Sequence, residues 1–358
     1  SRKIIFRQTE VRIYPKITEE DRKAAGCRME ILNSSNTTNQ SDFHSIFTKQ
    51  VLPPFYIAIF VLGLCLNVVA AWIFFRVPAD SGLVVYLKNM VVADLLMLLS
   101  FPFRVVDYFG YESLDLDVIK CRYTAVLFYF SMYVGILFIG FISLESRFSV
   151  VSVLQHIQRP TSAWVLAVLT WSLLFLCCAP NTILTSKFEE KQPGKCMDWK
   201  TPLGKQWHKV SSHISVSLFW VTLVIVTFCY TSIARQVCKT YRRMRRDTTD
   251  ICRKSNRSIF SILVVFFICF VPYHVCRVPF TLSQFSQSGF SPEVSFWLFQ
   301  IKEGALFLSA MNVCLDPVIY FLMCGTFRKS LLRKLSVKAR RKSCQNHSSE
   351  ALVHIDER

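Results

Sequence analysis

Three basic residues lie near the ends of long apolar stretches, where a lone charge is costly. His274 and Arg277 are three residues apart and so share one face of a helix, and Lys302 opens the next apolar stretch. Arg and Lys bind phosphate oxygens through charge-assisted hydrogen bonds. Unpaired cations on neighbouring helices repel each other, so Arg277 and Lys302 predict an anion between them. The alternatives are an inter-helix hydrogen bond for His274 and a side chain reaching lipid headgroups for Lys302.

Tyrosines and further cations accompany this set. Tyr129 and Tyr133 are four residues apart on one helical face, Arg104 lies near the outer end of the second apolar stretch, and Lys200 follows the fourth. Cations for phosphate beside aromatic faces for a base suit an anion with a flat ring, for example a nucleotide. For Arg104 as well, a side chain that reaches the headgroups is the alternative.

A second polar set lies deeper in the apolar stretches. Asp94 is midway along the second stretch, Asn67 is in the first, and Asn312 and Asp316 are in the seventh. Ionisable groups inside a membrane need a partner, a wet cavity or a function. The set predicts either a site that holds water or a cation such as sodium, or a hydrogen-bonded cluster that only fixes helix packing.

The sequence carries no pattern expected of an enzyme or of a disulfide-rich domain. We find no paired carboxylates, metal-spaced His and Cys or phosphate-cradling glycines, so we expect neither catalysis nor a cofactor. Many of the 14 cysteines lie inside apolar runs, where a thiol behaves as a small hydrophobe. Cys121 and Cys196 both fall outside the membrane, where a disulfide between them would hold the intervening loop over the site.

The elements that must position these residues are membrane-spanning helices. Of the 358 residues, 52% are hydrophobic and only 18% are charged, which is too apolar for an ordinary soluble domain. A helix needs about 20 apolar residues to cross a bilayer. Seven stretches qualify: Leu52–Phe75, Leu83–Val106, Tyr123–Val150, Ala163–Leu184, Ser211–Val237, Ile259–Leu282 and Phe296–Met323. The predicted fold class is an all-α membrane protein, a seven-transmembrane helix bundle with a short amphipathic helix after the last span.

Loop charges predict the orientation. The loop after the fifth span and the tail after the seventh are rich in Lys and Arg, which places both in the cytoplasm. Three glycosylation acceptors, Asn33, Asn36 and Asn39, lie in the leader, which is then extracellular. The net charge of +18 therefore indicates lipid headgroups and cytoplasmic partners rather than nucleic acid. We expect a multi-pass plasma-membrane protein, whose first span serves as the insertion signal unless the natural chain starts earlier.

Ordered motifs along the spans resemble a known family. They include Tyr86-Leu87-Lys88-Asn89, Phe101-Pro102-Phe103, Leu127-Phe128-Tyr129, Phe270-Val271-Pro272-Tyr273-His274, Lys302-Glu303 and Asn312-Val313-Cys314-Leu315-Asp316-Pro317-Val318-Ile319-Tyr320. Over Val51 to Lys334 the chain resembles rhodopsin-like G-protein-coupled receptors, and more narrowly the metabotropic purinergic receptors of the ADP and nucleotide-sugar branch.

The resemblance implies a ligand site and a mechanism. The matching ligand positions are Tyr129, Tyr133, Asn181, Lys200, His208, His274, Arg277, Gln284 and Lys302. The implied mechanism is a population shift, in which an extracellular nucleotide favours outward movement of the inner end of the sixth helix and opens a groove for an inhibitory-type heterotrimeric G protein. Pro272 would supply the bend, and the inner tyrosines Tyr230 and Tyr320 would reorganise. Membrane lipids are expected contacts, with arrestin and a second receptor copy as further possible partners.

Three departures from the family pattern bear on function. Where the family has Asp-Arg-Tyr at the end of the third span, this chain has Glu145, Ser146 and Arg147, so the coupling arginine is displaced by one residue. Either Arg147 substitutes through local rewinding of the helix or coupling is poor. Phe280 and Ser212 stand where Tyr and Asn are common, which removes two expected ligand hydrogen bonds, and Cys27 lacks its usual loop partner.

The expected organisation has four parts and leaves rival functions open. Residues 1–50 form a glycosylated extracellular segment, 51–325 the receptor domain, 326–335 an amphipathic juxtamembrane helix and 336–358 a disordered cytoplasmic tail. One alternative is a receptor-like binder with weak or no G-protein coupling, supported by Ser146. A transporter or channel is the other, but we see no internal repeat of the kind that such folds use.

Overall fold

The computed structural model describes residues 45–109, 114–151, 160–185, 196–197, 199–243, 249–285, 289–325 and 327–333. By its internal contacts the chain divides into Ser1–Phe43 and His44–Arg358, and every described residue belongs to the second unit. The glycosylation acceptors Asn33, Asn36 and Asn39 and the leader cysteine Cys27 lie outside the described residues, as does the tail from 334 onward.

The regular elements of the described residues are helices joined by turns and short loops, with one isolated bridge between Thr185 and Lys200. The elements are η2 (Phe47–Val51), α2 (Leu52–Phe74), α3 (Gly82–Tyr108), α4 (Leu114–Ile119), η3 (Lys120–Thr124), α5 (Ala125–Val151), α6 (Pro160–Ile183), α7 (Pro202–Arg243), α8 (Thr249–Ser283), α9 (Pro292–Ala310) and α10 (Asn312–Met323). Residues 327–333, after the last span, form a further short helix.

Seven of these segments are long and apolar enough to cross a membrane, which confirms the predicted fold class. Only helices satisfy their own backbone groups within hydrocarbon, which explains why each apolar run is helical. The fifth span begins at Pro202 rather than at the predicted Ser211. Lys205, His208 and Lys209 lowered the apparent hydropathy of these first two turns, although they continue the same helix. The last span is α9 followed directly by α10, with a single residue, Met311, between them.

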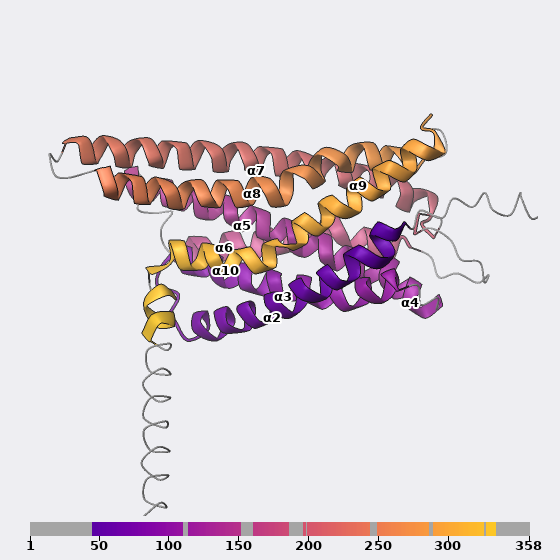
Figure 1. Cartoon of the computed structure of the whole chain (residues 1–358), viewed down its shortest axis with the longest axis horizontal. Coiled ribbons are helices and arrows are strands. Elements are labelled where there is room, and N and C mark those ends of the chain that lie inside the picture. The colour runs from indigo at the N-terminus through magenta and orange to yellow at the C-terminus, as the bar shows by residue number, and fades with distance from the viewer. Residues whose placement is uncertain are drawn as a thin grey trace, which may run out of the picture. The chain divides into compact units, whose positions relative to one another are not determined.

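Neighbouring helices pack along their lengths around a core of Phe, Tyr, Leu and Val side chains. Helix α3 contacts α2, α5 and α6, whereas α7 and α8 lie side by side and α8 contacts α9 (Figure 1). Apolar side chains also face outward. In the span Pro160–Ile183, only 22% of its apolar central segment is buried inside the protein. An outer surface of this kind suits lipid, because the surrounding medium is then as apolar as the core.

Ends of helices that carry the site are fixed by side-chain caps. The Ser81 hydroxyl accepts a hydrogen bond from the backbone N–H of Val84 at the start of α3, and Ser291 does the same for Val294 at the start of α9. Such caps satisfy N–H groups that have no partner inside the helix. Helices α3 and α9 therefore begin at defined residues.

Candidate ligand site

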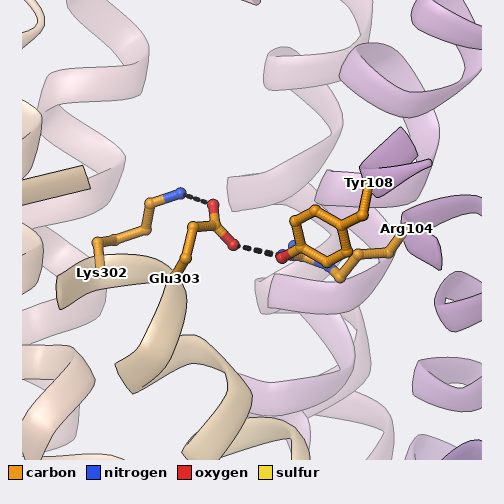
Figure 2. A network of polar contacts seen from close by, with 4 residues as sticks. All are labelled: Arg104, Tyr108, Lys302 and Glu303. Carbon is orange, nitrogen blue, oxygen red and sulfur yellow. Dashed lines mark hydrogen bonds and ion pairs between the residues drawn. The ribbon is translucent and has the colours of Figure 1, made fainter. Parts of the chain in front are cut away.

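One carboxylate joins two of the predicted cations. Glu303 of α9 accepts hydrogen bonds from Arg104 Nη1 at 3.1 Å and from the Tyr108 hydroxyl at 2.6 Å, both at Oε2, and its Oε1 forms an ion pair with the ammonium of the adjacent Lys302 (Figure 2). Glu303 is only 5% exposed. The network links α3 to α9 and satisfies four polar side chains with one another, as buried charges require.

This network corrects two expectations. Lys302 was expected to be unpaired and repelled by Arg277, but Glu303 neutralises it. Arg104 was expected, in one alternative, to reach the headgroups; it bonds Glu303 instead and lies 5.0 Å from the centre of the Phe128 ring. Glu303 itself received no role from the sequence, although an acid beside a lysine in an apolar stretch was the available signal. Which side chain it would meet depends on how α3 and α9 pack.

Lys302 also lies over aromatic rings. Its Nζ is 4.8 Å from the centre of the Phe280 ring and 4.7 Å from that of Phe299. A cation over an aromatic face is attracted by the ring quadrupole. Phe280, where the family commonly has Tyr, therefore contributes a cation–π contact without a hydroxyl, and it fixes where the ammonium lies.

Arg277 is buried among tyrosines. Its guanidinium carbon is 4.8 Å from the centre of the Tyr129 ring and 5.9 Å from that of Tyr273, and the two rings stack on each other at 5.9 Å. Its Nη2 donates to the Ser212 hydroxyl at 3.1 Å. Ser212, expected only to remove a ligand hydrogen bond, thus orients the arginine. Within the part of the chain that the structure describes, Arg277 has no carboxylate within ion-pair distance.

His274 uses both ring nitrogens inside the bundle. Nδ1 lies 2.7 Å from the Phe270 carbonyl oxygen, Nε2 lies 3.1 Å from the Tyr133 hydroxyl, and the ring stacks on Phe219 at 3.7 Å. The inter-helix hydrogen bond considered as the alternative for His274 is therefore present. Tyr133 and His274 together tie α5 to α8 directly below Arg277.

A disulfide positions the remaining basic residue. Cys121 and Cys196 are bonded, with their Cα atoms 5.4 Å apart, as the sequence predicted. The loop then pairs with the end of α6 through the bridge between Thr185 and Lys200. Lys200 Nζ donates to Asn181 Oδ1 at 3.4 Å, and Asn181 donates to Ser211 at 3.4 Å. Burial, together with the nearby Arg277, lowers the pKa of Lys200 to about 8.

Comparison with known proteins decides the family. The profile described as 7 transmembrane receptor (rhodopsin family) matches residues 66–320. The chain is a rhodopsin-family receptor. It is 43% identical to purinoceptor 14 of Bos taurus over 310 residues, covering 86% of this chain and 90% of that one. It is 39% identical to G-protein coupled receptor 87 of Mus musculus, covering 90% and 93%, and 33% identical to purinoceptor 13 of Homo sapiens, covering 97% of both. It belongs to the purinoceptor branch of these receptors and is not an enzyme.

The deeper polar set of the receptor gains one member. Tyr320 donates to Asp94 Oδ2 at 2.6 Å, which sequence reasoning did not include among the neighbours of Asp94. Asn67 donates to the carbonyl oxygens of Gly63 and Val313 at 2.9 and 2.6 Å. In the described part of the chain, the side-chain oxygens of Asn67 and Asn312 lack a hydrogen-bond donor, and the Asp316 carboxyl group interacts with that of Asp94. These free oxygens around Asp94 suit a cation or water, so a sodium ion here stays a prediction.

Arg147 does not occupy the place that the family's coupling arginine would have at position 146. Helix α5 is α-helical from Ala125 to Val151, so the local rewinding considered for Arg147 is absent. The Arg147 guanidinium instead lies 4.8 Å from the centre of the Phe228 ring of α7. The step of one residue is about 100° around the helix, which carries the charge to another neighbour. Pro272 lies inside α8 as predicted, and Tyr230 and Tyr320 are both buried.

Replacing Glu303 by Gln tests whether the buried network holds α3 to α9. Removing one member of a buried ionic cluster leaves uncompensated charge, and we expect a loss of about 3–5 kcal/mol of stability. The midpoint of thermal unfolding in detergent, measured with a thiol-reactive dye, should fall clearly below that of the wild type. Glu293→Gln is the matched control, because Glu293 is an exposed acid on the same helix. Equal midpoints for both variants would contradict the structural role of Glu303.

Proposed function

We propose that this receptor is activated by an extracellular nucleotide, either ADP-like or a nucleotide sugar, whose phosphates lie between Arg277 and Lys302. The observation that carries the proposal is the buried guanidinium of Arg277, 7% exposed, which has the Ser212 hydroxyl as a partner but no carboxylate among the described residues. A buried charge is costly unless it is paired. A phosphate would supply the missing counter-charge and bidentate acceptors.

The surrounding residues support a nucleotide over a simple anion. The stacked rings of Tyr129 and Tyr273 offer a flat apolar face beside the guanidinium. Lys200 adds a second cation on the disulfide side, near His208. Of the expected ligand positions, Arg277 lies over the Tyr129 ring and its charge acts on the nearby Lys200, and Lys200 hydrogen-bonds Asn181. The relatives named purinoceptors agree with a ligand of this class.

In this proposal the disulfide end of the bundle is extracellular and a G protein binds at the far end, where α5 finishes. Ligand phosphates would draw Arg277 of α8 and Lys302 of α9 together, and a state in which they are closer would then gain population. Pro272, one turn from Arg277, is the point at which α8 can bend. The inhibitory class of G protein, an arrestin, a second receptor copy and a sodium ion near Asp94 are parts of the proposal that rest on the family.

A second candidate, a receptor that binds ligand but couples weakly, is favoured by the position of Arg147. The side chain stacks on Phe228 of α7, while Ser146 offers no charge at the family's arginine position. In both proposed functions the ligand binds at the disulfide end, and coupling to a G protein takes place at the far end. The two proposals therefore share the same ligand site and differ only in coupling.

Replacing Arg277 by Ala and, separately, Lys302 by Ala tests the phosphate site. Loss of a charge-assisted pair to phosphate costs about 1.5–3 kcal/mol, so nucleotide affinity should fall by about tenfold or more in each variant. Competition binding of labelled nucleotide on intact cells measures this. Lys209→Ala, which removes a cation that stacks on Phe285 nearby, is the control and should leave affinity unchanged. Unchanged affinity in both test variants would remove the site assignment.

The lowered pKa of Lys200 predicts a pH dependence of binding. Lys200 carries its charge below its pKa of about 8 and loses it as the pH rises through that value, while Arg277 stays charged. Affinity for a nucleotide sugar, whose phosphates are esterified and keep constant charge, should therefore fall by up to about tenfold from pH 7 to pH 9.

The control for this pH dependence is Lys200→Arg, which retains its charge across the range and should show a flat profile. His208 is the other titratable side chain near Lys200, so His208→Gln is measured in parallel. A decline that persists in Lys200→Arg would contradict the assignment to Lys200.

Combining Ser146→Arg with Arg147→Tyr tests whether coupling is limited by the displaced arginine. The double variant restores the family's charge position and should raise agonist-stimulated nucleotide exchange on the G protein severalfold at equal receptor number. Ser146→Ala with Arg147→Tyr is the matched control without the new guanidinium. Equal activation by the wild type and the double variant would contradict this explanation. It would show that the position of the arginine does not limit coupling.

A further inference from the structure

The start of the first span contacts one face of α9. Ser45 comes just before η2, and its hydroxyl donates a hydrogen bond to Gln300 Oε1 at 2.7 Å. Phe47 lies against Gly304, since a Cβ atom at this glycine would be only 3.4 Å from Phe47 Cζ. Gln300 and Gly304 are four residues apart and therefore share one face of the helix. The contact of Ser45 and Phe47 with this face is called the clasp below.

Thr48 fixes the side chain of Ser45. The Thr48 hydroxyl accepts from the Ser45 N–H at 2.9 Å and donates to the Ser45 carbonyl oxygen at 3.1 Å, while the Ser45 hydroxyl accepts from the Thr48 N–H at 3.4 Å. Such reciprocal bonds satisfy N–H groups that have no partner inside a helix start. Thr48 is fully buried. A hydroxyl has one hydrogen to donate, and that of Ser45 goes to Gln300.

Aromatic contacts continue along the same face of α9. The Phe307 ring lies 5.8 Å from the Phe55 ring and 5.4 Å from the Tyr56 ring, both on α2. The Tyr56 ring lies 5.8 Å from that of Tyr108, whose hydroxyl donates to Glu303. The first span therefore reaches the buried ionic network through Tyr56 as well as along α9.

Gln300 is the first buried residue of α9. The residues before it, Pro292–Phe299, are exposed or half-buried, although the Phe299 ring lies 6.3 Å from the Phe280 ring of α8. The ammonium of Lys302 lies over these same two rings. At this depth α9 is therefore held by α8 on one side and by the clasp on the other.

We infer that Ser45, Phe47 and Gln300 are positioning residues for the ligand site. They hold α9 at the rotation in which Lys302 pairs with Glu303 (Figure 2). Gln300 and Lys302 are two residues apart on one rigid helix, so a rotation that parts Gln300 from Ser45 also moves the ammonium.

The clasp contributes to affinity without touching the ligand. A cation that is already in place binds an anion more tightly than one that the ligand must first order. This inference rests on the proposed function, because Lys302 matters there as a phosphate partner. The position of Lys302 can nevertheless be measured without any ligand.

Substitutions from both sides disrupt the clasp. Ser45→Ala removes the donor, Gln300→Leu removes the acceptor at similar size, and Gly304→Leu displaces the Phe47 ring. Ser45→Thr, which keeps a hydroxyl, and Gly304→Ala, whose added methyl group would lie at an ordinary contact distance from Phe47, are the matched controls.

Acylation of the Lys302 amine, on the full-length receptor in detergent without ligand, is the first readout. Mass spectrometry of peptides gives its rate relative to that of Lys239, an exposed lysine near the other end of α7. The rate should rise about fivefold in the three disrupting variants, as expected for loss of one hydrogen bond or packing contact, and stay within about twofold of the wild type in the controls. Ser45→Ala combined with Gln300→Leu should react no faster than the faster single variant, because both remove the same bond.

Competition binding of labelled nucleotide on intact cells is the second readout. Affinity should fall about threefold to tenfold in the three disrupting variants. In a Lys302→Ala background, Ser45→Ala should cause no further loss, because the clasp acts through Lys302. A general weakening of the fold would instead lower affinity equally in both backgrounds.

Unchanged acylation of Lys302 in all three disrupting variants would overturn the inference, as would additive effects of Ser45→Ala and Gln300→Leu. An equal loss of affinity from Ser45→Ala with and without Lys302 would also overturn it, since the clasp would then act elsewhere. A wild-type receptor that binds no labelled nucleotide would contradict the proposed function instead, and the acylation rates would still decide whether the clasp positions Lys302.

Discussion

A charge or a peptide group inside hydrocarbon must find its partner within the protein, and the structure of this receptor follows from that constraint. Backbone groups meet it by forming helices in every apolar stretch. Side chains meet it in clusters at two depths: Arg104, Glu303 and Lys302 near the disulfide end, and Asp94 and Tyr320 deeper in the bundle. Each cluster joins helices that are distant in sequence.

The same constraint distinguishes cations that are already paired within the fold from a cation whose counter-charge a ligand could supply. Glu303 neutralises Arg104 and Lys302, so these cations already have a role in holding α3 to α9. Arg277 is equally buried but has no described acid beside it. The difference matters for function, because an anionic ligand gains most where the protein has left a buried charge uncompensated. The same ligand must compete with Glu303 for Lys302.

The two ends of α5 show how one helix can serve two purposes. Near its start the disulfide of Cys121 fixes the loop that carries Lys200, and farther along Tyr133 bonds His274 of α8. At its other end the Glu145 carboxylate lies beside Gly82 of α3, while the Arg147 guanidinium lies over the Phe228 ring of α7. The helix is continuous between these contacts, so one element links the disulfide end to the far end. The departure at Ser146 therefore alters which partners the helix holds, not the path between the ends.

Sequence alone determined the number of spans and the family, and it predicted most of the residues of the proposed site. Apolar length and ordered motifs are local properties of the chain, and the disulfide between Cys121 and Cys196 followed from both lying on one side of the membrane. The pairing of Glu303 with Arg104, the hydrogen bond between Tyr133 and His274, the bond from Tyr320 to Asp94 and the close approach of Glu145 to Gly82 appeared only in the tertiary structure. Each depends on how two helices are rotated against each other, and a sequence periodicity specifies the face of one helix but not the side chain that it meets.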